Sequence, residues 1–262
     1  MILDEIVRHK KHEISELKNT YPLDKLKDDL QQFEPPRDFM KALKSTSTAD
    51  SKPINIIAEV KKASPSKGII RDDFNPVEIA KIYEENGAIA ISVLTDKKYF
   101  QGDTEYLKQI KETTSIPILN KDFIIDPYQI YQARVFGADA VLLIAAILKD
   151  DELSDCLDLC SQLGLHALVE VHTLKELKRV LSTNAQIIGI NNRDLKSFNV
   201  NANTSIQLAK HIPDTKTVVS ESGIDNKELI LKLQEIGIDA FLIGEALMKE
   251  KDYGKKLREL LN

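Results

Sequence analysis

The segments NGAIAISVLT (residues 86–95), FGADAVLLIAA (136–146) and IGIDAFLIGEA (236–246) repeat one pattern along the chain. In each of them, a glycine suited to end a helix is followed directly by a short apolar strand. The spacings of Gly87, Gly137 and Gly237 are multiples of about 25 residues, the length of one strand plus one helix. The pattern indicates a chain built from strand–helix units.

Eight such units account for most of the chain. Asn75, Asp126 and Thr173 stand where an N-cap belongs, at the start of amphipathic stretches that separate the apolar runs. Continuous apolar strands that alternate with helices are typical of a parallel sheet covered by helices. We therefore predict an α/β protein with a (β/α)₈ TIM barrel. An open doubly wound sheet is the alternative, but no GxGxxG turn follows the first strand. The strands are expected near residues 54–61, 88–95, 116–121, 139–145, 165–171, 186–191, 216–221 and 239–243.

The first 50 residues do not fit the repeat. ILDEIVRHKKHEISELK (2–18) and two shorter stretches are helix candidates, and STSTADSKP (45–53) is a linker candidate. We expect residues 1–262 to form a single barrel domain, with residues 1–50 as a helical extension packed on the barrel. The basic run RHKKH (8–12) is interpreted as a solvated helix face, and a role in closing over substrate is the alternative.

Composition narrows the class of protein. The formal charge of −5 argues against a general binder of nucleic acid or of anionic membranes. The longest apolar run, VLLIAAIL (141–148), is far too short to cross a bilayer, and no signal peptide is evident. We therefore expect a cytoplasmic monomer that binds neither nucleic acid nor membrane. Cys156 and Cys160 are interpreted as small residues on a packed helix face and not as metal ligands.

Polar residues stand at the ends of most predicted strands, where the active sites of such barrels lie. Because side chains alternate between the two faces of a strand, Glu59 and Lys61 share a face, as do Asn191 and Arg193. If those faces point inward, Ile57, Leu119, Leu168 and Val219 form an apolar layer below a polar one. Mixed charges held together shift one another's pKa values, which suits acid–base catalysis. The expected polar layer consists of Glu59, Lys61, Lys121, Glu170, Asn191, Arg193 and Glu221.

The last two strand ends carry small residues. Ser222-Gly223 and Gly244-Glu245 would let backbone N–H groups approach an anion, and GEALMK (244–249) looks like a short extra helix. A phosphate site after strands 7 and 8 is a recurring device of this fold. We therefore predict a small-molecule phosphorylated substrate, with Ser64 adding a hydroxyl.

The chain resembles the indole-3-glycerol phosphate synthase family over essentially its whole length. The resemblance is carried by IIAEVKKASPSKG, SVLTDKKYFQG, PILNKDFIID, ADAVLLIAAIL, LVEVH, IGINNRDL, SESGI and DAFLIGEALM. It implies a (β/α)₈ barrel with an N-terminal helical extension that needs neither cofactor nor metal. It also implies conversion of 1-(2-carboxyphenylamino)-1-deoxyribulose 5-phosphate to indole-3-glycerol phosphate, with loss of CO₂ and water, in tryptophan biosynthesis.

The resemblance also implies roles for individual residues. Lys121 would be the general acid in ring closure and Glu170 the base in dehydration. Lys61 and Arg193 would hold the substrate carboxylate, while Glu59 and Asn191 would orient the lysines and sugar hydroxyls. Glu221 would be a further polar contact. By strand alternation and loop position, Lys62 and Lys67 are expected outside the site. The phosphate would lie at Ser64, Ser222, Gly223, Gly244 and the backbone N–H of Glu245, and the aromatic ring at Phe100, Phe123, Leu142 and Leu195.

Three other interpretations remain. One is a barrel like phosphoribosylanthranilate isomerase, although that chemistry is usually run by a cysteine and an aspartate at strand ends. Another is a Schiff-base aldolase using Lys121 or Lys61, although flanking carboxylates favour protonated lysines. The last is a phosphosugar-binding barrel without turnover, which should lack a complete acid–base set.

Overall fold

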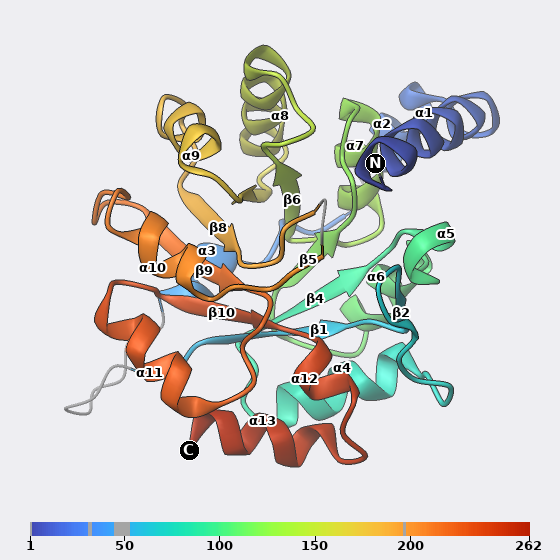
Figure 1. Ribbon diagram of the computed structural model, residues 1–262. Coiled ribbons are helices and arrows are strands. Elements are labelled where there is room, and N and C mark those ends of the chain that lie inside the picture. The colour runs from blue at the N-terminus through green and yellow to red at the C-terminus, as the bar shows by residue number, and fades with distance from the viewer. Residues whose placement is uncertain (1, 31–32, 45–52, 196–197) are drawn as a thin grey trace.

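Eight parallel strands close into a barrel in the computed structural model, which describes residues 2–30, 33–44, 53–195 and 198–262 (Figure 1). The predicted (β/α)₈ fold is confirmed, and each strand begins and ends within two residues of its expected bounds. The barrel strands are β1 (Ile56–Val60), β4 (Ala90–Leu94), β5 (Ile118–Lys121), β6 (Ala140–Ile144), β7 (His166–Val171), β8 (Ile187–Asn191), β9 (Thr217–Glu221) and β10 (Ala240–Ile243).

Helices cover the outside of the barrel. The side chains of the three expected N-cap residues, Asn75, Asp126 and Thr173, each accept a backbone N–H of the first turn. The predicted GEALMK helix is present as α12. The covering helices are α4 (Pro76–Glu85), α6 (Glu105–Lys111), α7 (Pro127–Val135), α8 (Asp150–Gln162), α9 (Leu174–Leu181), α10 (Asn203–Ala209), α11 (Lys227–Glu235) and α13 (Tyr253–Leu261), with short extra helices α5 (Lys97–Phe100) and α12 (Glu245–Met248).

The repeated glycines end helices as the sequence indicates. Gly87, Gly137 and Gly237 have φ angles of 97°, 93° and 93°, in the left-handed region that residues with a Cβ avoid. Each glycine therefore lets the chain turn directly from a helix into the next strand.

The barrel is closed by the pairing of β1 with a neighbouring strand on each side. This strand is hydrogen-bonded to β10 on one side and to β4 on the other, and every neighbouring pair is parallel. The inward faces are those expected from alternation, because Ile57, Leu119, Leu168 and Val219 all belong to one fully buried cluster inside the barrel. A second, larger cluster lies between the strands and the helices.

The turn after β1 is more ordered than its sequence suggests. Residues 63–69 form a two-stranded antiparallel sheet of β2 (Ala63–Ser64) and β3 (Gly68–Ile69). Gly68, with a φ angle of 67°, helps the loop reverse between these strands. The small sheet follows the carboxyl end of β1.

The N-terminal extension forms three helices, α1 (Ile2–Thr20), α2 (Leu23–Asp29) and α3 (Phe39–Leu43). Phe39 and Leu43 are fully buried in the cluster inside the barrel, and Asn55, just before β1, donates to the Leu43 carbonyl at 2.9 Å. Helix α3 therefore closes the end of the barrel at which the strands begin. The expected linker lies outside the described residues over positions 45–52. In the part of the chain that the structure describes, no helix is long and apolar enough to cross a membrane.

Replacing Phe39 with alanine should lower the free energy of unfolding by about 3–5 kcal/mol, because the cavity left under the barrel strands cannot refill. Denaturant titration of the purified protein measures the change. The matched control is Phe33→Ala, since Phe33 is 38% exposed, and it should change stability by less than about 0.5 kcal/mol. Equal losses of stability in the two variants would show that Phe39 of α3 does not fill the end of the barrel.

Candidate active site

Two lysines and three carboxylates meet where the barrel strands end. Lys121 Nζ lies 3.1 Å from Glu221 Oε2, 3.7 Å from Glu59 Oε1 and 3.9 Å from Glu170 Oε2. Lys61 bonds to the other oxygen of Glu59. These contacts join β1, β5, β7 and β9, so residues far apart in the sequence form one charged cluster.

The strand register sets the height of this cluster. Lys121, Asn191 and Glu221 are the last residues of their strands, and Asn191 is paired directly with Glu221 across β8 and β9. Because parallel strands end on the same side of the sheet, these side chains share one level above the apolar interior. The Asn191 side chain also accepts the Arg193 N–H at 2.9 Å, which fixes the start of the following loop.

Burial and pairing oppose each other at Lys121. Burial alone would lower the pKa of its ammonium, but the charges of Glu221, Glu59 and Glu170 outweigh that effect and raise the pKa well above its usual value. The same balance acts on Glu59, where burial would raise the pKa but Lys61 and Lys121 hold it below its usual value. Lys121 is therefore a charged donor at neutral pH.

Glu221 behaves differently from Glu59. Burial, together with the nearby charge of Glu170, raises its pKa to about 7 in spite of the opposing charge of Lys121. Its side chain is 1% exposed, and it alone of the expected site residues does not line the cavity described below. Its carboxylate contacts Lys121, which does line the cavity.

Two glycines make room for the carboxylates. A Cβ on Gly189 would lie 2.3 Å from Glu221 Oε1, and one on Gly244 would lie 2.1 Å from Glu59 Oε2. The sequence predicts that the Gly244 backbone approaches a bound anion. The structure shows that the lack of a side chain at Gly244 also leaves room for the Glu59 carboxylate. Gly189 was not singled out from the sequence, although a glycine inside the apolar strand IIGIN is an available signal.

His172 is another residue without a role predicted from the sequence. Its Nε2 lies 3.3 Å from Glu170 Oε1 and its Nδ1 lies 3.3 Å from Glu176 Oε2. Burial would lower the pKa of this imidazole, but the hydrogen bond to Glu176 and the charge of Glu170 raise it above its usual value. Alternation along LVEVH places His172 on the face of Glu170, so this contact could have been expected.

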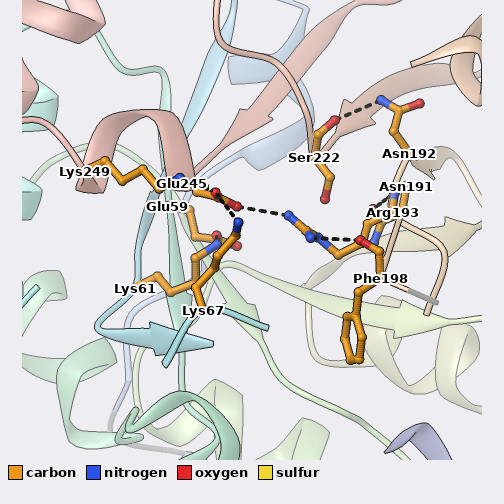
Figure 2. Close-up of polar contacts among 10 residues, drawn as sticks. All are labelled: Glu59, Lys61, Lys67, Asn191, Asn192, Arg193, Phe198, Ser222, Glu245 and Lys249. Atoms are coloured by element: carbon orange, nitrogen blue, oxygen red, sulfur yellow. Dashed lines mark hydrogen bonds and ion pairs between the residues drawn. The ribbon is translucent and has the colours of Figure 1, made fainter. Parts of the chain in front are cut away.

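The turn after β9 has an unusual backbone. Ser222 and Gly223 have φ angles of 67° and 73°, and such a conformation in a serine is uncommon away from constrained sites. Asn192, 2% exposed, donates to the Ser222 carbonyl at 3.1 Å and accepts the Ser205 N–H at 3.1 Å, as Figure 2 shows in part. A residue next to the expected Asn191 therefore holds the turn in place.

Cations gather around the Glu245 side chain (Figure 2). Arg193 Nη2 lies 3.1 Å from Glu245 Oε2, Lys249 Nζ lies 2.5 Å from Oε1, and Lys67 Nζ lies 3.9 Å from Oε1. From the sequence, only the backbone of Glu245 is expected in the site, and Lys67 is expected outside it. Both residues in fact line the same cavity as Ser64 and Gly223.

A cavity of about 660 Å³ opens above the polar layer. Its walls contain the expected site residues other than Glu221, in three groups. The polar layer contributes Glu59, Lys61, Lys121, Glu170, Asn191 and Arg193. The expected phosphate end, formed by β2 and the residues after β9 and β10, contributes Ser64, Ser222, Gly223, Gly244 and Glu245. The apolar side contributes Phe100, Phe123, Leu142 and Leu195. The rings of Phe100 and Phe123 are 6.1 Å apart between centroids, so they form one aromatic wall.

Residues 2, 3 and 6 of α1 also line this cavity. The extension thus reaches the catalytic end of the barrel as well as the opposite end. Within the basic run RHKKH, Lys10 is buried, so the interpretation of that run as a solvated face is wrong at this position.

The described residues contain no group of three or more histidine, cysteine, aspartate or glutamate side chains arranged to hold a metal ion. Cys156 and Cys160 are buried in α8, as expected, and burial raises the pKa of the Cys156 thiol to about 11. Neither lies at a strand end, which argues against an isomerase that uses a cysteine there.

The fold and the site define a barrel enzyme with acid–base groups at the carboxyl ends of its strands. The family model "Indole-3-glycerol phosphate synthase" matches residues 3–260. The chain is 49% identical to the indole-3-glycerol phosphate synthase of Alkaliphilus metalliredigens over 99% of this chain and 98% of that protein. It is 48% identical to that of Thermoanaerobacter pseudethanolicus, over 100% and 97%, and 49% identical to that of Campylobacter jejuni, over 100% of both.

The chain belongs to the indole-3-glycerol phosphate synthase family. It is a carboxy-lyase of tryptophan biosynthesis that forms indole-3-glycerol phosphate from a small phosphorylated substrate. Among solved structures, thiamine phosphate pyrophosphorylase from Pyrococcus furiosus shares the fold, with a TM-score of 0.60 and 18% identity over 79% of this chain and 93% of that chain.

Replacing Glu221 with glutamine should stabilise the protein more at pH 8 than at pH 5. Between the usual pKa of 4.5 and about 7, folded Glu221 keeps its proton while the unfolded chain releases it. The original protein therefore loses stability as the pH rises through that range, and the variant does not. Denaturant titrations at the two pH values measure the difference.

The control for this measurement is Glu228→Gln. Glu228 is exposed, and its hydrogen bond with Lys232 lowers its pKa, so the change should be small and opposite in sign. A Glu221→Gln effect that is equal at pH 5 and pH 8 would show that the Glu221 pKa is not raised.

Proposed function

We propose that the polar layer around Lys121 carries out the acid–base steps of indole-3-glycerol phosphate formation. The observation that carries this proposal is the position of the Lys121 ammonium, which is 14% exposed and within 4 Å of three carboxylates. The substrate is 1-(2-carboxyphenylamino)-1-deoxyribulose 5-phosphate, and its carbonyl must be protonated, its carboxylate lost and its C2′ hydroxyl expelled.

Ring closure needs an acid. As the ring carbon that bears the carboxylate attacks the C2′ carbonyl, negative charge develops on the carbonyl oxygen. Lys121 donates a proton to this oxygen, and Glu59, Glu170 and Glu221 keep the lysine charged until that moment. The same carboxylates oppose a Schiff-base mechanism, which requires a neutral amine.

Loss of CO₂ restores the aromatic ring, and dehydration follows. Lys121 has given up its proton in ring closure, so the C2′ hydroxyl leaves as water with a proton from Lys61, which the loss of CO₂ has released from the carboxylate, and Glu170 accepts the proton from C1′. The Glu170 side chain is 3% exposed and lies between Lys121 and His172, so it is held in one place. Such positioning is what a general base requires.

The remaining residues bind the substrate. Lys61 and Arg193 hold its carboxylate, and Glu59 and Asn191 orient the lysines and the sugar hydroxyls. Phe100, Phe123, Leu142 and Leu195 enclose the aromatic ring. The phosphate lies at Ser64, Ser222, Gly223, Gly244 and the Glu245 N–H, at the end of the cavity where Lys67 and Lys249 supply positive charge.

We also propose that residues 1–262 form one barrel domain and that the enzyme acts as a monomer in the cytoplasm. The acid–base groups and the cavity wall all come from one chain, so the proposed mechanism needs no second copy. Sedimentation at micromolar concentration tests the oligomeric state.

Replacing Lys121 with alanine should lower kcat by about 10²–10⁴-fold, the usual contribution of a positioned acid. The fluorescence of the indole product reports turnover, in buffer with EDTA because no metal is expected to be needed. Lys62→Ala is the matched control, since Lys62 is not in the cavity wall, and it should retain its activity. An unchanged rate in Lys121→Ala would mean that another group, with Lys61 next in line, is the acid.

A further inference from the structure

Lys10 is buried although it belongs to a charged run at the surface of α1. Its side chain is 3% exposed, and its Nζ lies 2.9 Å from Asp122 Oδ1, 3.1 Å from Asp96 Oδ2 and 3.0 Å from Glu13 Oε2. Burial would lower the pKa of this ammonium, but the charges of Asp122, Asp96 and Glu13 raise it above its usual value. Lys10 is thus a fixed charge between the extension and the barrel.

The two aspartates stand at the base of the loops that carry the aromatic wall. Asp96 follows β4 and accepts the Tyr99 N–H at 2.7 Å, at the start of the short helix that ends in Phe100. Asp122 follows Lys121 at the end of β5 and accepts the Phe123 N–H at 2.7 Å. Lys10 therefore contacts the anchor of each loop.

A hydroxyl joins these two strand ends. The Thr95 Oγ1 lies 2.8 Å from Asn120 Oδ1 and 2.7 Å from Asp122 Oδ2. Thr95, Asp96 and Asp122 are all at least nine-tenths buried. The contact is consequently part of a connected polar network and not an isolated surface pair.

The first two turns of α1 are part of the cavity. Ile2, Leu3 and Ile6 line it together with Phe100 and Phe123, one turn or more before Lys10 on the same helix. Helix α1 also meets α5 through Tyr99, whose hydroxyl lies 3.1 Å from Glu5 Oε1, and the two helices lie near each other in Figure 1. The apolar side of the cavity is therefore completed by a segment outside the barrel.

We propose that Lys10 is a positioning residue that holds α1 against the ends of β4 and β5 and so completes the pocket for the substrate's aromatic ring. This proposal rests on the proposed function, which places that ring at Phe100 and Phe123. Without the Lys10 charge, two buried carboxylates would repel each other and α1 would lose its link to the loops. Among the described residues, no hydrogen bond or ion pair joins Lys10, Asp96 or Asp122 to the ends of β9 and β10, where the phosphate is proposed to lie.

The test compares Lys10→Met with Lys18→Met. Both changes remove an ammonium from α1, and both break an ion pair with the barrel, since Lys18 Nζ lies 2.7 Å from Asp126 Oδ2. The Lys18 pair is exposed, with side chains 42% and 31% accessible, and it lies away from the cavity wall. Surface pairs of this kind contribute little.

The measurements are KM and kcat with the substrate, and the inhibition constant of inorganic phosphate. Lys10→Met should raise KM about tenfold, the scale of losing apolar contacts in a pocket. Its kcat should fall by less than KM rises, and the phosphate inhibition constant should not change. Amide hydrogen exchange in α1 should accelerate, whereas Lys18→Met should match the original protein in all respects. Lys10→Arg, which keeps the charge, should restore most of the affinity.

Other outcomes would overturn the proposal. Unchanged KM in Lys10→Met with faster exchange in α1 would show that the helix does not shape the pocket. A parallel rise in KM and in the phosphate inhibition constant would indicate a general structural role. If Lys10→Met does not fold, Lys10→Met/Asp96→Asn removes one of the buried charges and is measured in the same way. Failure of the proposed function itself would show instead as undiminished turnover in Lys121→Ala.

Discussion

The Lys121 ammonium is held among Glu59, Glu170 and Glu221 in a space nearly closed to water, and much of the structure serves that arrangement. A buried charge is stable only with opposite charges close by, and a cluster of carboxylates is stable only with cations between them. Each carboxylate must also fit inside a narrow barrel. The glycines at positions 189 and 244 meet this steric demand, since a Cβ at either would overlap a carboxylate oxygen.

The barrel converts this local demand into a usable site. Parallel strands end on one side, so their last inward residues form a polar layer directly above the apolar residues that fill the interior. The apolar layer provides the low dielectric that strengthens the charge interactions, and the polar layer carries the chemistry. The difference between Glu59 and Glu221 follows from position within that layer: Glu59 has two lysines beside it, whereas Glu221 shares one lysine with two other carboxylates.

The N-terminal extension acts at both ends of the barrel. Helix α3 fills the end where the strands begin, through Phe39 and Leu43. Helix α1 lies at the other end, where Lys10 contacts the acidic residues that follow β4 and β5. A barrel of eight strands leaves both ends open to solvent, and here one segment of chain covers the first end with apolar side chains and contributes apolar wall to the second.

Features that depend on neighbouring residues could be predicted from the sequence. They are the strand–helix units, their glycine ends and N-caps, and the inward faces that carry Glu59, Lys61, Lys121 and Glu170. Strand alternation and helix capping are local rules, so a single sequence reveals them. The burial of Lys10, the room that Gly189 leaves for Glu221, and the pairing of Arg193, Lys67 and Lys249 with Glu245 were decided only by the tertiary structure. Each of these contacts depends on which distant strand or loop lies opposite. The sequence pattern repeats with the period of a strand or a helix, and such a period does not reveal which distant residue will be the partner.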